Sequence, residues 1–209
     1  MTPKQVDKEA RRREIAFAAA DLFSQRGLAR TTIQDIAQNA GIGKGTVYEY
    51  FSSKDEILSA SFEYIFHDMD MFLQQKLQTA ESPLDSLRGI FDGMYTFIVE
   101  MQLDMAEILL VFWAEGILED PATNVSGVAG QFDMKEIYTQ YSALIIDILN
   151  AGKADGTFRE DLDSMHMASA IIGAIDGLML QWVIYKKAIP LQDILNTYLE
   201  ALLRGILHE

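Results

Sequence analysis

Small, polar and aromatic side chains occur together in the segment Lys44–Phe51. Val47 and Phe51 are four residues apart, so they share one face of a helix and we expect them to be buried. The other side chains then face solvent, where they can bind phosphates or base edges through hydrogen bonds. The candidate contact residues are Lys44, Thr46, Tyr48 and Tyr50, and Gly45 would let the backbone approach a ligand closely.

The sequence offers few side chains for catalysis or metal binding. It contains no cysteine, and its three histidines, His67, His166 and His208, are far apart in the chain. Neither Gly-x-Ser-x-Gly nor His-Glu-x-x-His occurs. We therefore expect no catalytic residue, no metal site and no cofactor. An enzyme that holds a lipid-like substrate in an apolar pocket remains an alternative.

Helices must position these residues, because apolar residues recur three and four apart and glycine or proline separates the resulting segments. No segment shows the alternating pattern of a β-strand. We predict an all-α fold of about nine helices. They span roughly 8–26, from Thr32 to Gly41, 44–50, from Ser53 onward, 83–101, 104–118, 131–153, from Asp163 to about Lys187, and from Pro190 to about Leu207.

Capping residues mark the start of several helices. Thr32, with Asp35 three residues later, has the pattern of a capping box, and Ser53 with Glu56 repeats it. Gly43 is a weaker N-cap because it has no hydroxyl group. These residues therefore predict where three consecutive helices begin.

The two short helices joined by residues 40–44 have the layout of a helix-turn-helix. In that motif the first helix braces the second, which lies in a major groove of DNA. The spacing alone is also compatible with two short helices that merely pack together. DNA binding and simple packing both remain open on this evidence.

Charge is divided unevenly along the chain. The net charge of −14 argues at first against a nucleic-acid partner. Residues 1–60, however, carry a net charge of +1, and residues 61–209 carry −15. The two parts therefore have different electrostatic roles. The triplet Arg11–Arg13, with Lys4 and Lys8, is compatible with a phosphate-seeking arm and equally with a solvated helix end.

The chain has no apolar run of the roughly 18 to 20 residues that a membrane span needs. Its first residues, MTPKQVDKEARRRE, are charged where a signal peptide would be apolar. We expect a soluble, cytoplasmic protein with no membrane partner.

The segment TTIQDIAQNAGIGKGTVYEYFSSKDEIL closely resembles the signature of the TetR (tetracycline-repressor) family of transcriptional regulators. The preceding EIAFAAADLFSQRGLART resembles the first helix of that family. A weaker similarity covers Gly156–Asp163 and Ile175–Leu178, near the family's dimer helices. The strong resemblance extends over about residues 11–60. It favours DNA binding over simple packing.

The resemblance implies a DNA-binding head of three helices at residues 8–54, with the helix-turn-helix at about 32–51. It also implies a larger ligand-binding and dimerisation domain at 55–209. Gly43 stands where the family most often has serine, so a capping hydroxyl is missing. By resemblance, Thr32 contacts a phosphate, Lys44, Gly45, Thr46 and Tyr48 meet bases or backbone, and Tyr50 and Lys54 hold phosphates.

The C-terminal part is rich in aromatic residues and methionine, which suit an adaptable apolar cavity. An aromatic at helical spacing is usually part of the core, so the cavity is inferred from the resemblance. Carboxylates such as Asp176 interrupt apolar runs; one of them could bind a cationic ligand, although a solvent-facing or capping role is the simpler interpretation. The candidate pocket residues are Phe66, Phe91, Tyr95, Phe112, Trp113, Tyr138 and Tyr141.

The last two predicted helices are apolar around more of their circumference than a one-sided surface helix requires. Pairing with their copies in a second subunit would cover them and form a homodimer. Two recognition helices would then lie about 34 to 36 Å or somewhat more apart, on a near-palindromic operator in double-stranded DNA. We expect a repressor released by a small apolar or aromatic effector. A protein-interaction module with a vestigial head is the second alternative.

Overall fold

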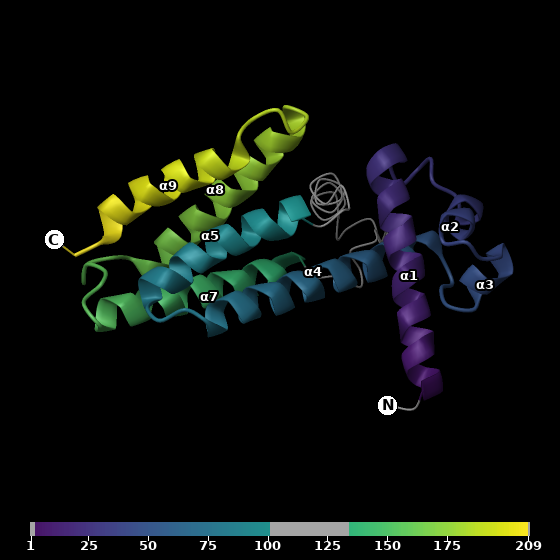
Figure 1. Ribbon diagram of the computed structural model, residues 1–209, viewed down its shortest axis with the longest axis horizontal. Helices are drawn as coiled ribbons and strands as arrows, with labels where there is room; N and C mark the ends of the chain where they lie inside the picture. Colours follow the sequence, from purple (N-terminus) through teal and green to yellow (C-terminus); the bar gives the residue numbers. More distant parts are fainter. Residues whose placement is uncertain (1–2, 101–133, 209) are drawn as a thin grey trace, which may run out of the picture. The chain divides into compact units, whose positions relative to one another are not determined.

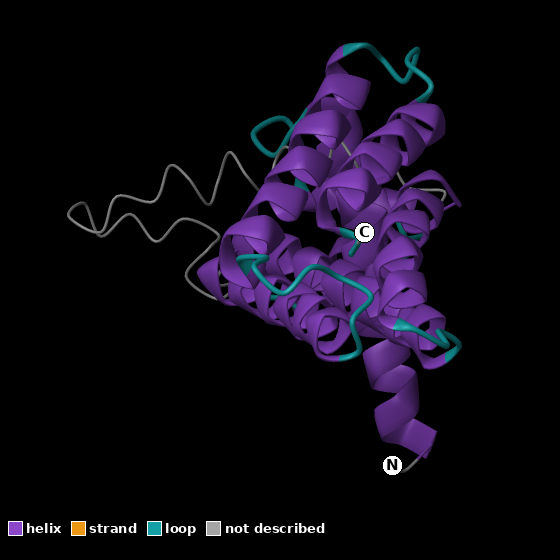
Figure 2. Cartoon of the chain, turned by 90° about the vertical axis from the view of Figure 1, so that its left-hand side faces the viewer, coloured by secondary structure: helices purple, strands orange, loops and turns teal. Residues whose placement is uncertain are grey.

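The computed structural model describes residues 3–100 and 134–208. All regular secondary structure in these two ranges is helical (Figure 2), as expected for an all-α fold. The helices are α1 (Pro3–Arg26), α2 (Ile33–Asn39), α3 (Lys44–Tyr48), α4 (Lys54–Gln78), α5 (Pro83–Glu100), α7 (Met134–Ala154), α8 (Ser164–Ile184) and α9 (Leu191–Ile206). The helix predicted at 104–118 and the loop predicted at 119–130 lie outside the described residues.

Several helix ends differ from the prediction. α1 begins at Pro3 and not near residue 8, because proline suits the first position of a helix and charged residues with good helix propensity follow it. α3 ends at Tyr48, two residues early. α8 ends at Ile184 and not near Lys187, because Lys186 and Lys187 have φ angles of 51° and 63°. A residue in this left-handed region cannot continue a right-handed helix.

The chain forms two compact units, and α4 contributes residues to both. The described part of the N-terminal unit is residues 3–68 and Met134, and that of the C-terminal unit is residues 69–100 and 135–208. The boundary between the units falls inside α4, after Asp68. The division of function at residue 54 stays a prediction.

In the N-terminal unit, α1 packs against α2 and α2 against α3 (Figure 1). The apolar residues that recur three and four apart in α1 lie at the centre of this core, and all of them but Ala18 are fully buried: Ile15, Ala18, Ala19, Leu22 and Phe23. The buried residues from the first three helices and their connections are Ile15, Ala16, Ala19, Ala20, Leu22, Phe23, Ile36, Ala37, Val47 and Phe51. This core positions the helix-turn-helix.

In the C-terminal unit, α9 packs against both α5 and α8. The Phe158 ring covers Gly152 of α7, where a Cβ atom would come within 2.1 Å of the ring. Phe158 also pairs with Leu207 in an isolated bridge, and Arg159 N donates to Ile206 O at 2.9 Å. The connection between α7 and α8 is therefore fastened to the end of the chain.

α8 is more apolar than we expected from the sequence, in which we predicted no apolar run long enough to span a membrane. Among the described residues it is the one helix long and apolar enough to cross a membrane by length and composition, with a mean hydropathy of 1.6. Only 22% of its apolar window is buried within this chain. Length and composition alone do not distinguish a membrane span from a helix that packs against protein. The partner that covers the exposed face of α8 must therefore be argued from other observations.

Candidate nucleic-acid interface

The start of α2 is fixed by the capping box predicted from Thr32 and Asp35. Asp35 N donates to Thr32 Oγ1 at 3.2 Å, and Thr32 N donates to Asp35 Oδ2 at 3.0 Å. The Thr32 hydroxyl also donates to Asp35 Oδ2 at 2.6 Å. The Thr32 hydroxyl and amide together hold the pKa of Asp35 below its ordinary value. The Thr32 hydroxyl already caps α2, so a contact with a phosphate would be a second role for this side chain.

A tight turn sets the angle between α2 and α3. Gly41 has a φ of +66°, which glycine adopts without strain, and Ile42 N donates to Ala37 O at 2.9 Å. Gly43 follows with an extended conformation and, as expected, makes no side-chain cap. α2 is also tied to α1, because Asn39 Nδ2 donates to Ala18 O at 2.9 Å.

α3 presents the predicted faces. Val47 is 0% exposed and Phe51 is 2% exposed, whereas the Tyr48 side chain is 51% exposed. Lys44 Nζ lies 5.9 Å from the centroid of the Tyr48 ring, so a cation and an aromatic ring stand side by side in solvent. Thr46 and Tyr50 are half-buried at the edges of this surface.

Gly45 is exposed, and nothing in the described residues lies within 4 Å of the position that a Cβ atom would take. Packing within the chain therefore does not require glycine at this position. The open space is compatible with the predicted close approach of a binding partner to the backbone, which stays a prediction.

The missing cap at Gly43 leads to a stability prediction. Gly43→Ser supplies the hydroxyl that an extended N-cap uses, and it removes a flexible residue from the unfolded chain, so we expect about 0.5 to 1 kcal/mol of added stability. The nearest atom to a new Cβ is Thr46 Oγ1 at 3.9 Å, an ordinary contact. Chemical denaturation measures the change in the free energy of unfolding.

Gly41→Ser is the matched control for Gly43→Ser. The same new side chain at Gly41, with its φ of +66°, should destabilise the protein by about 1 to 2 kcal/mol. Equal effects of the two substitutions would contradict the backbone geometry described for this turn.

Lys54 has a different environment from the one expected of a free phosphate ligand. Its Nζ donates to Leu28 O at 2.7 Å and to Thr31 O at 3.1 Å. The ammonium group thus joins the start of α4 to the connection between α1 and α2. One of its three donors is left for another acceptor.

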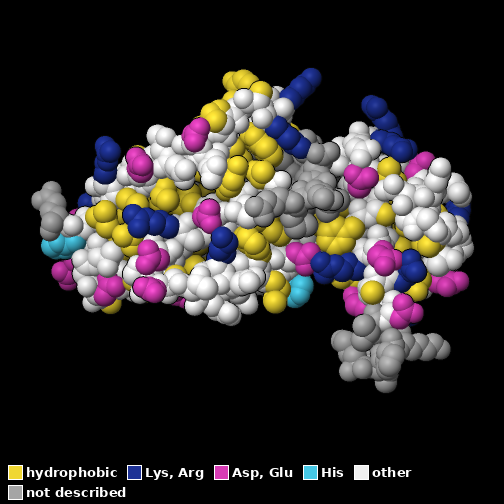
Figure 3. Space-filling view, in the orientation of Figure 1, with side chains coloured by type: hydrophobic (Ala, Val, Ile, Leu, Met, Phe, Trp, Pro, Cys, Tyr) yellow, Lys and Arg dark blue, Asp and Glu magenta, His cyan; other side chains and the backbone are white. Residues whose placement is uncertain are grey.

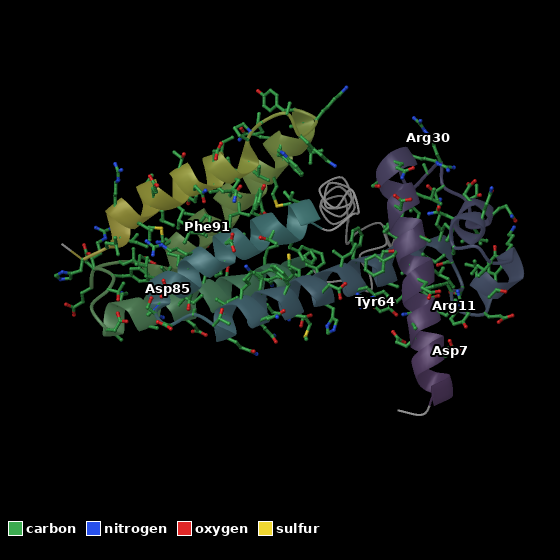
Figure 4. The ribbon with its side chains drawn as sticks, viewed as in Figure 1. Asp7, Arg11, Arg30, Tyr64, Asp85 and Phe91 are labelled. Atoms are coloured by element: carbon green, nitrogen blue, oxygen red, sulfur yellow. The ribbon has the colours of Figure 1, made fainter. Side chains whose placement is uncertain are left out.

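Each arginine of the triplet on α1 pairs with a carboxylate, one on α1 and two on α4. Arg11 Nη1 lies 2.6 Å from Glu14, Arg12 Nη2 lies 3.3 Å from Glu56, and Arg13 pairs with Asp68. Figure 4 shows Arg11 and Tyr64 on opposite sides of α1. Arg12 and Arg13 therefore belong to the packing of α1 against α4, and the structure gives little support to a mobile phosphate-seeking arm.

Sequence reasoning missed the second role of Glu56. We expected Glu56 to bond back to Ser53, and Glu56 N does donate to the capping Ser53 Oγ at 3.0 Å. Its carboxylate instead accepts from Ser52 N and Ser52 Oγ, both at 2.7 Å. The serine pair in SSKDE was the available signal, but sequence alone does not decide which serine turns towards the carboxylate.

The structure describes five of the seven predicted pocket residues, and they have different surroundings. In the C-terminal unit, Phe91 is 3% exposed and its ring lies 5.8 Å from that of Tyr198, which places it in the core. Tyr95 lines a hollow of about 270 Å³ together with Trp182 and Pro190. Half-buried Phe66 belongs to the N-terminal unit, and Phe112 and Trp113 lie outside the described residues.

Tyr138 and Tyr141 place hydroxyl groups beside carboxylates within the C-terminal unit. Tyr138 Oη donates to Asp176 Oδ2 at 2.6 Å, and Tyr141 Oη donates to Asp70 Oδ1 at 2.7 Å. Burial raises the pKa of Asp176, and burial with the Asp70 contact raises the pKa of Tyr141. Asp176 is therefore neither a capping residue nor on a solvent face, the two roles we considered simpler for it.

Comparison with known proteins gives consistent results along the chain. The model of bacterial regulatory proteins of the tetR family matches residues 15–60. The model of the C-terminal part of BetI-type transcriptional repressors matches residues 102–204. The HTH-type transcriptional repressor KstR2 of Mycolicibacterium smegmatis is 33% identical over 208 residues, which cover 98% of this chain and 94% of that protein.

Two solved structures share the fold. The ketosteroid transcriptional regulator KstR2 of Mycobacterium tuberculosis is 27% identical with a TM-score of 0.70, and the match covers 95% of this chain and 96% of the other. FadR from Bacillus subtilis, in complex with stearoyl-CoA, is 24% identical with a TM-score of 0.73, covering 92% and 98%.

Together, the braced α3 and these matches define the class of protein as a helix-turn-helix transcriptional regulator. The chain belongs to the TetR family, and the predicted resemblance is confirmed. It is a transcriptional repressor, as are the relatives that match it along its length. The DNA contacts, the dimer and the effector remain to be assigned.

Proposed function

We propose that this chain binds a near-palindromic operator as a homodimer, with α3 of each subunit in a major groove. The observation that carries the proposal is the division of α3 into a buried Val47 and an exposed face with Lys44 and Tyr48. On this proposal Lys44, Gly45, Thr46 and Tyr48 meet bases or backbone, and Thr32, Tyr50 and Lys54 hold phosphates. These contacts form in the cytoplasm, and no membrane takes part.

The Lys54→Met variant distinguishes a phosphate contact of Lys54 from its hydrogen bonds within the protein. Lys54→Met leaves the Leu28 and Thr31 carbonyls without the ammonium, so we expect a loss of about 1 to 3 kcal/mol in stability. The loss of one phosphate contact per subunit should also reduce the slope of log K against log salt by about 0.9 per subunit. Binding at several salt concentrations measures this slope. Lower stability with an unchanged slope would mean that Lys54 serves only as an internal brace.

The exposed face of α8 supports the homodimer. Met165 is 66% exposed, Leu180 39% and Ile184 63%, and the small residues Ser169 and Gly173 on the same helix are also exposed. Small residues allow another helix to approach closely, and large apolar residues lose solvent contact when it does. Figure 3 shows apolar side chains gathered near the end of α8. A second copy that packs α8 and α9 against their equivalents would cover this face.

We further propose an apolar effector of the ketosteroid or fatty-acyl kind. The relatives support this choice, because one is a ketosteroid regulator and another was crystallised with stearoyl-CoA. Tyr138 and Tyr141 supply hydroxyl groups inside the C-terminal unit, where a mostly apolar ligand needs a few polar anchors. Binding there acts on α4, which supplies Asp70 to the C-terminal unit and Lys54 to the N-terminal unit.

The effector must favour the arrangement that does not bind DNA. A coupling of about 1 to 3 kcal/mol, or 5- to 150-fold, is ordinary for such a switch. Titration calorimetry with a ketosteroid and with stearoyl-CoA, on free and operator-bound protein, measures it. We expect weaker binding of one compound to the DNA complex. Equal affinity of every bound compound for the two forms would contradict release by ligand.

A further inference from the structure

Arg12 of α1 reaches the segment that follows the recognition helix. Its guanidinium carbon lies 4.6 Å from the centroid of the Phe51 ring, close enough for a cation–π contact. The same guanidinium donates through Nη2 to Glu56 Oε1 at 3.3 Å. Phe51 is 2% exposed, so this aromatic ring is held between the arginine and the core.

Glu56 connects the other side of the same segment. While Oε1 accepts from Arg12, Oε2 accepts from the Ser52 amide and hydroxyl, both at 2.7 Å. The Ser52 hydroxyl and amide, more than Arg12, hold the pKa of Glu56 below its ordinary value. One carboxylate on α4 therefore bonds at the same time to α1 and to the residue after Phe51.

The bonded segment controls the last turn of the recognition helix. Tyr50 N and Phe51 N both donate to Val47 O at 3.0 Å, so the residues up to Phe51 are bonded directly to α3. The exposed Lys44 and Tyr48 lie on this helix. Functional side chains need positions held to within about 0.5 Å, which packing and supporting hydrogen bonds supply. Arg12 and Glu56 contact the two residues at the exit of α3, Phe51 and Ser52.

The neighbouring Arg11 shows what a solvated arginine on α1 looks like. Arg11 pairs with Glu14 three residues later, and its side chain is 42% exposed. The Arg12 side chain is 28% exposed and reaches residues more than 35 positions away in the sequence. The two arginines have the same charge and adjacent positions, but only Arg12 contacts the exit of α3.

We propose that Arg12 and Glu56 are positioning residues for operator recognition, which set the orientation of α3 without touching DNA. The inference rests on the proposed function and specifies how the DNA-binding surface is held. Loss of either residue should reduce affinity for the operator while leaving non-specific DNA binding unchanged. It also gives α4 a direct connection to the recognition helix within the N-terminal unit.

The test compares Arg12→Gln with the matched control Arg11→Gln. Both remove one positive charge from α1, so their effects on long-range attraction to DNA are equal. We expect Arg12→Gln to weaken operator binding by about tenfold or more, in the range of coupled residues in one network, with an unchanged salt slope. Arg11→Gln should change operator affinity by less than about twofold, as surface substitutions usually do. Arg12→Lys, which keeps the charge above Phe51, should restore part of the affinity.

Glu56→Gln provides a second variant of nearly identical shape. It should lower the ratio of specific to non-specific affinity in the same direction, and it should speed amide hydrogen exchange at Ser52 in the DNA-free protein. The double variant Arg12→Gln/Glu56→Gln should be no worse than the more affected single variant, because both substitutions break one network. Circular dichroism and thermal unfolding confirm that each variant is folded.

Three results would overturn the inference. If Arg12→Gln lowers the salt slope by about one per subunit, Arg12 holds a phosphate and does not act through α3. If Arg12→Gln and Arg11→Gln bind the operator equally well, neither residue positions the helix. If the unaltered protein itself enriches no DNA sequence, the proposed function fails first, and the inference fails with it.

Discussion

Tyr48→Ala should abolish most operator binding while leaving the fold intact. The side chain is 51% exposed on α3, so its removal should change stability by no more than about 0.5 kcal/mol. A base contact is worth about 1 to 3 kcal/mol, and a dimer makes it twice. The expected loss is therefore about 2 to 6 kcal/mol, or roughly 30- to 20,000-fold in the dissociation constant. Fluorescence anisotropy with labelled operator DNA measures it.

Two further substitutions sharpen the Tyr48→Ala experiment. Tyr48→Phe removes the hydroxyl alone and should show an intermediate loss if that group donates to DNA. Met71→Ala, at a side chain 56% exposed in the C-terminal unit, should leave operator binding unchanged. Loss of helicity or of the dimer in Tyr48→Ala would mean that this residue belongs to the core and not to the DNA-binding surface.

Gly173→Leu should break the dimer without harming the subunit. Nothing described in this chain lies within 4 Å of a Cβ at Gly173, and leucine favours a helix over glycine by somewhat less than about 1 kcal/mol. In a twofold dimer packed through α8, each new side chain would overfill the interface at about 1 to 3 kcal/mol. The dimer dissociation constant should rise roughly 30- to 20,000-fold. Analytical ultracentrifugation over a concentration series measures it.

Operator affinity should fall together with the dimer, since two linked heads bind far more tightly than separate ones. Gly89→Leu is the matched control, because Gly89 on α5 also has open space where its Cβ would be. It should remain dimeric and bind DNA normally. A dimeric Gly173→Leu protein would show that another surface joins the subunits.

Much of the N-terminal unit follows from local sequence signals. Thr32 and Asp35 form the capping box that their spacing predicts, and Gly41 adopts the left-handed conformation that its position requires. Val47 and Phe51 are buried as the helical period predicts. These features depend on residues within one or two turns of each other, so sequence spacing alone determines them.

Interactions between distant residues could not be predicted in this way. The donors of Lys54 reach carbonyl groups 26 and 23 positions earlier in the sequence, and Arg12 reaches Glu56 across 44 positions. These partners meet only when α4 packs against α1 and against the connection between α1 and α2. The aromatic residues of the C-terminal part present the same difficulty, because core residues such as Phe91 and half-buried residues such as Tyr138 have the same helical spacing.

Selection of random duplex DNA by the purified protein at about 0.15 M salt tests the central claim most directly, because specific binding must be measured where non-specific attraction is screened. The account predicts enrichment of one near-palindromic site, which Tyr48→Ala no longer selects and Arg11→Gln still selects. Enrichment of no sequence, with only weak binding that disappears as salt increases, would contradict operator recognition by α3.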